Sequence, residues 1–344
     1  MTQTPRPKLK LPPNVERFPG RGPCRVLALS GGGYRGLFSA RVLERMTAHL
    51  PERRRSPREH FSLLAGTSVG GLVAAGFAVG RTPTEMVRIL VRHGERIFDP
   101  RYRVWRWRIP LAKPDGHLGG LLRAKYERDA LEAAIVEVLG DDAMTVGDVP
   151  MPLLLVATCA TTKAPFLMSN VDPAGRSARL NPHVRLVDAL LATSAAPGYF
   201  PAVHVERRSL IDGGLVANAP DLVALAEAIR HRQADLTSAE VLSVGTAGPD
   251  RAEIPADVGG RGLLRWMTDL VPLTLDAQES LVVSQAQALL GDRYRRINAS
   301  PAPGQVGVLA LDAATRKATD TLLRLADAAV AKLRPYEIRR WFPS

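Results

Sequence analysis

The stretch "VLALSGGGYRG", residues 26–36, decides the fold more than any other part of the chain. An apolar run leads into three consecutive glycines, and a helical segment, "LFSARVLERM", follows them. Gly31, Gly33 and Gly36 satisfy the pattern G-x-G-x-x-G, which between a strand and a helix can hold a dinucleotide pyrophosphate. The same backbone N–H groups could instead stabilise the oxyanion of an acyl-transfer intermediate. Only residues elsewhere in the chain can separate these two interpretations.

A second motif, "GTSVG" at residues 66–70, lies between an apolar run at 61–65 and a run of small residues at 69–79. G-x-S-x-G between a strand and a helix is typical of a nucleophile elbow, in which small neighbours permit a sharp turn with the serine at its tip. The alternative is a plain helix cap. The predicted elbow consists of Ser68 with Gly66, Thr67, Val69 and Gly70.

A serine nucleophile needs a base, which is usually a histidine oriented by an acid. Seven histidines are scattered along the chain: His49, His60, His93, His117, His183, His204 and His231. Only His231 follows the best acid candidate, and it lies in the charged stretch "AIRHRQ". Asp212 in "IDGG" stands out instead, because it ends an apolar strand and is followed by Gly213 and Gly214, which allow close approach. A buried carboxylate with a raised pKa can accept a serine proton directly. The alternative for this Asp-Gly is an ordinary turn.

The predicted second strand decides what the glycines do. A dinucleotide-binding fold should place an acidic residue about 20 positions after the glycines, at the end of that strand. The strand at 61–65 ends in Gly-Thr-Ser with no carboxylate. We therefore predict an oxyanion hole formed by Gly31, Gly32, Gly33, Arg35 and Gly36, with amides around Gly32, Gly33 and Val69 as donors and Arg35 bracing the loop.

Strand and helix signals alternate from residue 26 onward, which favours an α/β fold with a mainly parallel sheet. We expect strands at 26–29 and 61–65, one or two within 151–170, and one within 240–248. We expect helices at 35–49, 69–79, 82–98, 125–140, 186–201 with a break at Pro197-Gly198, and over most of 262–298 and 312–334. Residues 209–231 should form a strand, a turn and a helix. We divide the chain into a basic, proline-rich arm (1–23), a catalytic domain (24–250) and a mainly helical C-terminal part packed on it (251–344).

With all three motifs in order, the chain resembles the patatin-like phospholipases. "GGGYRG" matches their G-G-G-x-[RK]-G oxyanion box, "GTSVG" their elbow and "DGG" the motif of their catalytic Asp, while "ATSAAPGYFP" and "LSVGTAG" recur in the family. The resemblance covers about residues 25–250. It implies a three-layer α/β/α fold, a Ser68–Asp212 dyad without histidine, an acyl-enzyme intermediate, and no metal or cofactor.

"SGGGYRGLF", "EHFSLLAGTSVGGL", "DGGLVANAPDLVAL" and "LLGDRYRRIN" resemble more narrowly the bacterial effectors of cyclic-oligonucleotide antiphage signalling, the CapV type. This implies a cytoplasmic enzyme that attacks membrane phospholipids at the inner face of the cell membrane once a cyclic dinucleotide binds, with a possible homo-oligomer on activation and no nucleic-acid polymer as partner. Two alternatives remain: an α/β-hydrolase-type esterase that uses His204 or His231, and a non-catalytic nucleotide-binding module.

The bulk composition fits a globular enzyme with anionic partners. The net charge is +12, from 46 Lys and Arg against 34 Asp and Glu, which would attract nucleic acid or an anionic lipid surface; the alternative is that it serves solubility alone. Two cysteines, Cys24 and Cys159, have no metal-ligand spacing. Residues 61–80 are long enough to span a bilayer, yet "GTSVGG" divides them into strand, turn and helix. "RYRVWRWRIP", residues 101–110, interleaves Trp with Arg, as a membrane-interface loop would; the alternative is a core-packing Trp pair with solvated Arg neighbours.

Overall fold

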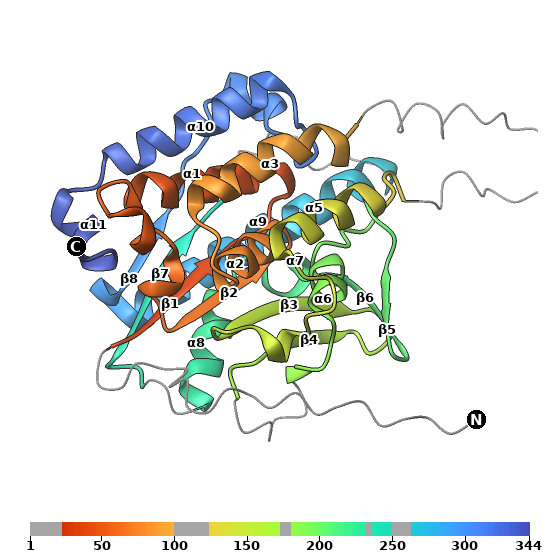
Figure 1. The fold of residues 1–344 in the computed structure, drawn as a ribbon. Helices are drawn as coiled ribbons and strands as arrows, with labels where there is room; N and C mark the ends of the chain where they lie inside the picture. The colour runs from red at the N-terminus through yellow and green to blue at the C-terminus, as the bar shows by residue number, and fades with distance from the viewer. Residues whose placement is uncertain (1–22, 100–123, 173–179, 232–234, 249–262) are drawn as a thin grey trace, which may run out of the picture.

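The computed structural model describes residues 23–99, 124–172, 180–231, 235–248 and 263–344 (Figure 1). Strand β1 (Cys24–Leu29) shows how the layers arise from the sequence. Val26 and Ala28 point into one buried apolar cluster, whereas Leu27 and Leu29 belong to another. Because neighbouring residues of a strand face opposite sides, a strand that is apolar throughout needs cover on both faces. The apolar run at 26–29 therefore predicts the middle layer of an α/β/α sandwich, which the structure confirms.

The sheet has eight strands in the described part of the chain, in the order β5-β6-β3-β2-β1-β7-β8, with β4 paired to β3 outside this path. Strands β2 (Leu63–Thr67), β3 (Leu153–Cys159), β7 (Ala239–Val244) and β8 (Tyr294–Ile297) continue the parallel arrangement around β1. Strands β4 (Ala164–Ser169), β5 (Val203–Val205) and β6 (Arg208–Asp212) pair in antiparallel fashion. The carboxyl ends of β1 and β2 lie side by side, since Leu29 is in register with Gly66. This brings the glycine loop to the elbow.

Helices cover both faces of the sheet (Figure 1). One face carries α1 (Gly36–Thr47), α2 (Val69–Ala78), α3 (Pro83–Ile97), α5 (Asp129–Leu139), α6 (Leu186–Thr193) and α10 (Arg316–Ala331). The other carries α8 (Asp221–Arg230) and the end of α9 (Leu263–Leu290). Two shorter helices, α7 (Gly214–Ala217) and α11 (Pro335–Trp341), complete the fold. A capping box begins α3, with reciprocal hydrogen bonds between Thr82 and Glu85.

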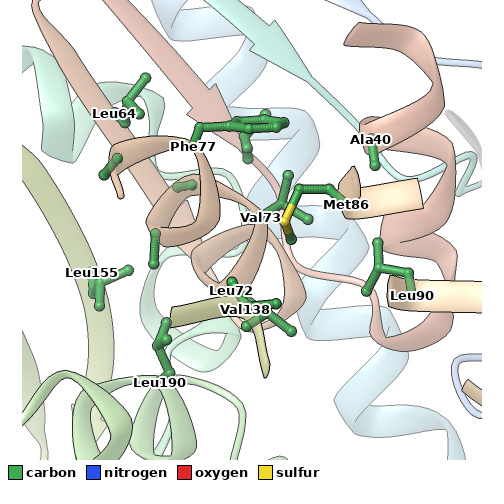
Figure 2. Packing of buried hydrophobic residues seen from close by; sticks show 14 of the residues in the cluster. Ala40, Leu64, Leu72, Val73, Phe77, Met86, Leu90, Val138, Leu155 and Leu190 are labelled. Carbon is green, nitrogen blue, oxygen red and sulfur yellow. The ribbon is translucent and has the colours of Figure 1, made fainter. Parts of the chain in front are cut away.

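Helix α2 is buried almost all round, which explains its small residues. Figure 2 shows Phe77, Val73 and Leu72 of this helix packed among side chains from its neighbours, with Met86 of α3 beside them. A Cβ at Gly76 would lie 2.4 Å from the sulfur of Met86, so a larger residue there would require the Met86 side chain to move. The helix that presents Ser68 is thus held tightly.

The C-terminal segment packs against the segment that carries the motifs. Asp327 of α10 receives hydrogen bonds from Arg41 and Arg45 of α1, at 2.8 Å from each Nε. Trp341 of α11 stacks on Phe61 with ring centroids 6.1 Å apart. Strand β8 extends the sheet beyond β7.

Several sequence predictions of local structure were wrong. Residues 294–297 form strand β8 rather than helix, because their side chains pair with α9 and α11 while their backbone joins β7. The short edge strand β5 was not predicted. Helix α6 ends at Thr193 rather than continuing to Pro197. Residues 61–80 do form strand, turn and helix, and no helix in the described part of the chain meets the length and hydropathy needed to cross a bilayer.

Candidate active site

Ser68 lies at a sharp turn between β2 and α2, with φ of 54° and ψ of −130°. A non-glycine residue with positive φ is strained, and such strain gathers at functional sites. The flanking glycines are required by close backbone contacts. A Cβ at Gly66 would lie 2.3 Å from the carbonyl oxygen of Gly70, and one at Gly70 would lie 2.3 Å from that of Leu29. The local geometry is that of a nucleophile elbow.

The glycine loop leaves only some of its amides available. The Gly31 N–H donates to the carbonyl of Asn218 at 3.0 Å, and the Arg35 N–H donates to that of Gly32 at 3.2 Å. The Gly36 N–H is likewise bound within the loop. Within the described part of the chain, the N–H groups of Gly32, Gly33 and Val69 make no hydrogen bond. These three are therefore the candidate donors to an oxyanion, whereas Gly31 anchors the loop.

Gly33 owes its identity to its conformation. Its φ is +56°, and a Cβ there would lie 2.2 Å from the carbonyl oxygen of Leu311. That same oxygen accepts the N–H of Tyr34 at 2.8 Å. The loop is thus pinned from the C-terminal side by Leu311, a contact that the sequence did not indicate.

Asp212 ends strand β6 and is buried, with 7% of its surface exposed. Its Oδ1 accepts the N–H of Gly214 at 2.7 Å. Burial raises the pKa of this carboxyl to about 6, against the opposing effect of hydrogen bonds from Gly214 and from the Ser68 side chain. A Cβ at Gly213 would lie 2.0 Å from the carbonyl oxygen of Val156, so the close approach predicted for this glycine is present. A carboxylate with this pKa is ionised at neutral pH yet basic enough to take a proton.

Ser68 and Asp212 line the same cavity, whose empty volume is about 970 Å³ including its open mouth. Gly32, Gly33 and Val69 also line it. Most of its other walls are aliphatic or aromatic and come from α2, α3, α5 and α9, among them Leu72, Leu90, Ile97, Phe98, Val271 and Leu275. The structure thus places the predicted elbow, glycine loop and carboxylate around a space suited to an apolar chain.

The histidine alternatives lie elsewhere. The imidazole of His204 is 3.2 Å from the Ser209 hydroxyl on β6. That of His231 lies near two carboxylates, 3.5 Å from Glu227 and 3.9 Å from Asp172. No histidine of the described residues lines the cavity that contains Ser68.

Arg35 is predicted to brace the glycine loop, and its guanidinium interacts with helix α9. Its side chain lies near Gly248 and faces the carboxylates of Asp276 and Glu279 on α9. Burial lowers the pKa of its guanidinium, while these two carboxylates oppose that change. Arg35 therefore connects the glycine loop to α9 electrostatically.

The arginines of "GDRYRRIN", residues 291–298, are engaged within the fold. Arg293 donates to the carbonyl of Leu236, Arg295 pairs with Glu337 at 2.9 Å, and Arg296 pairs with Glu279. All three guanidinium groups thus have partners within the protein. The Trp/Arg stretch at 101–110 and the arm at 1–22 lie outside the described residues.

The segment "ATSAAPG", residues 192–198, contributes a functional residue that motif reasoning left unassigned. Thr193 accepts the backbone N–H of Ser68, and Ala195 accepts that of Asp212. The signal in the sequence was the recurrence of this segment in the resembled family, but a recurrence alone does not reveal a contact.

Comparison with known proteins agrees with this arrangement. The family model for patatin-like phospholipase matches residues 27–225, and the chain belongs to that family. It is accordingly a phospholipase of the carboxylic ester hydrolase class.

Among curated proteins, the chain is 36% identical over 307 residues to the cGAMP-activated phospholipase of Pseudomonas aeruginosa, covering 86% of this chain and 85% of that one. It is 32% identical to the cGAMP-activated phospholipase of Vibrio cholerae, over 73% of this chain and 71% of that one. It is also 30% identical to the cUMP-AMP-activated phospholipase of Escherichia coli, over 64% of each chain.

Proposed function

We propose that the protein hydrolyses membrane phospholipids with a Ser68–Asp212 dyad. The observation that carries this proposal is the position of both side chains on one apolar cavity, where burial raises the pKa of Asp212 to about 6. Ser68 Oγ attacks the ester carbonyl while Asp212 takes its proton. The protonated Asp212 then returns the proton to the leaving alcohol, and the acyl chain stays on Ser68.

Deacylation follows by the reverse logic. Asp212, ionised again, removes a proton from a water molecule that attacks the acyl-Ser68 ester, and the proton passes to Ser68 Oγ as the fatty acid leaves. In both steps the negative charge on the former carbonyl oxygen is received by the amides of Gly32, Gly33 and Val69. Loss of one such donor typically costs about 10²–10³ in rate.

We further propose that a cyclic dinucleotide activates this enzyme at the inner face of the cell membrane, as part of defence against phage. The support comes from the relatives, two named cGAMP-activated and one cUMP-AMP-activated phospholipases. An enzyme that attacks its host's membrane has to be silent until signalled. A ligand that moves the population from 1:99 to 99:1 needs about 10⁴-fold preference for the active state. A change of oligomeric state on activation belongs to this proposal.

The test uses vesicles of phosphatidylethanolamine and phosphatidylglycerol that carry a fluorogenic phospholipid. Wild type, Ser68→Ala and Asp212→Ala are each titrated with 3′,3′-cGAMP and cUMP-AMP. Light scattering measures the mass of the protein assembly in each titration, which reports the oligomeric state. We expect one nucleotide to raise the wild-type rate by orders of magnitude, and both variants to stay inactive while folded. Near-normal turnover in Asp212→Ala would refute the dyad; full activity without nucleotide would refute the activation and leave the dyad standing.

A further inference from the structure

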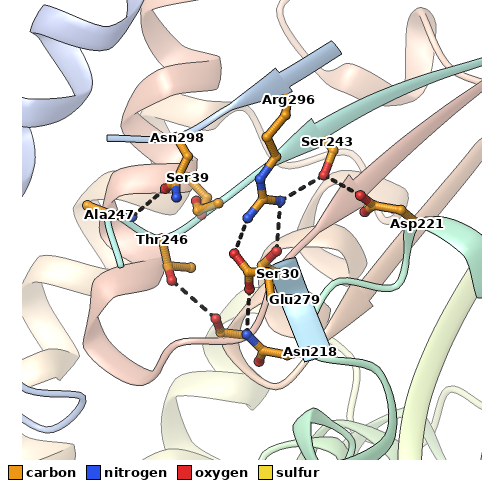
Figure 3. A network of polar contacts seen from close by, with 12 residues as sticks. Ser30, Ser39, Asn218, Asp221, Ser243, Thr246, Ala247, Glu279, Arg296 and Asn298 are labelled. Carbon is orange, nitrogen blue, oxygen red and sulfur yellow. Dashed lines mark hydrogen bonds and ion pairs between the residues drawn. The ribbon is translucent and has the colours of Figure 1, made fainter. Parts of the chain in front are cut away.

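A buried polar network lies directly behind the glycine loop (Figure 3). Its centre is the ion pair between Arg296 of β8 and Glu279 of α9, whose side chains are 13% and 18% exposed. Figure 3 shows the guanidinium between Ser243 on one side and Glu279 and Ser30 on the other. A buried pair is costly to desolvate, so its presence needs a reason beyond stability.

The second oxygen of Glu279 is used by Asn218. The Asn218 Nδ2 donates to Glu279 Oε2 at 2.6 Å, and the Asn218 backbone N–H donates to Gln278 Oε1 at 2.7 Å. Asn218 comes four residues after Gly214 and lines the cavity that contains Ser68. Two neighbouring residues of α9 therefore fix one asparagine at the cavity wall.

Asn218 in turn holds the glycine loop. The backbone carbonyl of Asn218 accepts the N–H of Gly31 at 3.0 Å. Gly31 immediately precedes Gly32 and Gly33, whose amides are free. Arg296 reaches the same loop by a second route, since its Nη1 donates to Ser30 Oγ at 2.9 Å. The network thus contacts the loop at Ser30 and Gly31, and it also borders the segment that follows Asp212.

We infer that Glu279 and Arg296 are positioning residues for the hydrolysis: the ion pair fixes Asn218 and Ser30, and through them the direction of the Gly32 and Gly33 amides. The inference rests on the proposed function, in which the amides of Gly32 and Gly33 stabilise the oxyanion of the reaction. A displacement of about 1 Å at such a site can cost about a hundredfold in rate. A carboxylate is needed at 279 because two donors, from Arg296 and Asn218, converge on its two oxygens.

The experiment separates positioning from stability. Glu279→Gln and Arg296→Met each leave an unpaired buried group and should lower the unfolding temperature. The double variant Glu279→Leu, Arg296→Met removes both charges, and replacing a buried pair with apolar residues of similar volume is often neutral. We expect it to recover part of the lost unfolding temperature, because Arg35 and Asp221 each lose one neighbour of opposite charge but keep their other partners. Asn218 still lacks its acceptor.

The readouts, taken with and without saturating 3′,3′-cGAMP or cUMP-AMP, are kcat and KM on a water-soluble chromogenic ester and the rate at which a fluorophosphonate labels Ser68. Both rates are expressed per active site, counted from the labelling reached at completion. In the double variant we expect kcat and labelling rate to be lowered about tenfold to a hundredfold, with KM within about twofold. Arg295→Gln is the matched control. Arg295 lies next to Arg296 on β8 and pairs with Glu337 of α11. This ion pair does not contact the glycine loop, so kcat should stay as in wild type.

Recovery of kcat together with stability in the double variant would overturn the inference, as would an equal loss in Arg295→Gln. If the double variant does not fold, Glu279→Asp decides: it keeps the charge against Arg296 but withdraws the carboxylate from Asn218, and an unchanged kcat would overturn the inference. Ser68→Ala is included so that a failure of the dyad itself, seen as residual hydrolysis, is recognised separately and removes the basis of the inference.

Discussion

The backbone N–H of Ser68 donates to Oγ1 of Thr193, 125 residues further along the chain, at 2.9 Å. The same hydroxyl donates to the carbonyl of Val156 on β3, and the carbonyl of Thr193 accepts the N–H of Gly213 at 3.2 Å. Two residues later, the carbonyl of Ala195 accepts the N–H of Asp212 at 2.9 Å. One short segment thus holds both the elbow and the carboxylate, and it sets their separation.

Thr193→Val should therefore lower both stability and activity. The change keeps the shape but leaves the buried N–H of Ser68 and the carbonyl of Val156 without partners, which costs about 1–3 kcal/mol for each unsatisfied group. We expect kcat on a soluble ester to fall at least about tenfold, since the elbow loses its fixed position. Thermal unfolding and steady-state kinetics provide the measurements.

Two controls accompany this variant. Thr193→Ser keeps the hydroxyl and should restore most of kcat. Thr47→Val removes a buried hydroxyl that donates to Leu43 within α1, so it should affect stability only slightly and leave kcat unchanged. A Thr193→Val enzyme with wild-type kcat would show that the hydrogen bonds of the Thr193 hydroxyl are not needed for catalysis.

The sequence predicted the local parts of the site better than the parts formed by distant segments. Ser68, Asp212 and the glycines could be singled out because a nucleophile elbow and a glycine loop require particular residues at fixed spacing, and the apolar runs around them predicted the central strands. Gly31 illustrates the limit. It belongs to the pattern, but its amide is taken by Asn218, and only the fold reveals that partner.

The C-terminal third shows the same limit on a larger scale. The four residues of β8, Tyr294–Ile297, include two arginines and carry no apolar run, so nothing local marks them as a strand. They become a strand because β7 offers a free edge and because Glu279 and Glu337 accept the two guanidinium groups on opposite sides. Tertiary contacts outweigh local propensity here.

The pH dependence of hydrolysis should report Asp212. Below a pKa of about 6 the carboxyl is protonated and unable to accept the Ser68 proton, so kcat/KM should fall about tenfold for each pH unit below that value. Above about pH 7 the titration of Asp212 should no longer change kcat/KM. The measurement is kcat/KM on a soluble ester from pH 4.5 to 8, because this ratio reports the free enzyme. A limb near pH 4, the ordinary value for an aspartate, would contradict the assignment of Asp212 as a desolvated base.

Gly33→Ala should impair the oxyanion loop more than it impairs the fold. The positive φ alone costs an alanine about 1–2 kcal/mol, and the added Cβ would also lie 2.2 Å from the carbonyl oxygen of Leu311. The loop has to move to relieve this contact, and we expect kcat to fall about a hundredfold or more. Gly291→Ala is the matched control, since Gly291 has a φ of +54° and nothing within 4 Å of the added atom. It should lose similar stability from backbone strain and keep wild-type kcat; an equal loss of kcat in both variants would contradict a local effect at the loop.

Asp212→Asn should abolish hydrolysis and make the protein more stable. Burial raises the pKa of Asp212 from 3.8 to about 6, so the folded state binds its proton more tightly than the unfolded state does. The ionised carboxylate therefore costs stability, on the order of 3 kcal/mol at pH 7, and this cost develops as the pH rises from about 4 to about 6. Asparagine removes the charge but keeps an oxygen for the N–H of Gly214. The variant should thus unfold at a higher temperature than wild type at pH 7, and the two should converge near pH 4.

Asp327→Asn supplies a comparison of opposite sign. Hydrogen bonds from Arg41 and Arg45 lower the pKa of Asp327 to about 2, so its ionised form stabilises the fold at neutral pH. Its loss should lower the unfolding temperature at pH 7, and the difference from wild type should shrink as the pH falls from about 4 toward 2. Because the carboxylate is partly exposed, the effect should be small and should weaken with added salt. If Asp212→Asn instead behaved like Asp327→Asn, losing stability at neutral pH, Asp212 would be a structural ion held by its surroundings rather than a base kept in a desolvated site for the reaction.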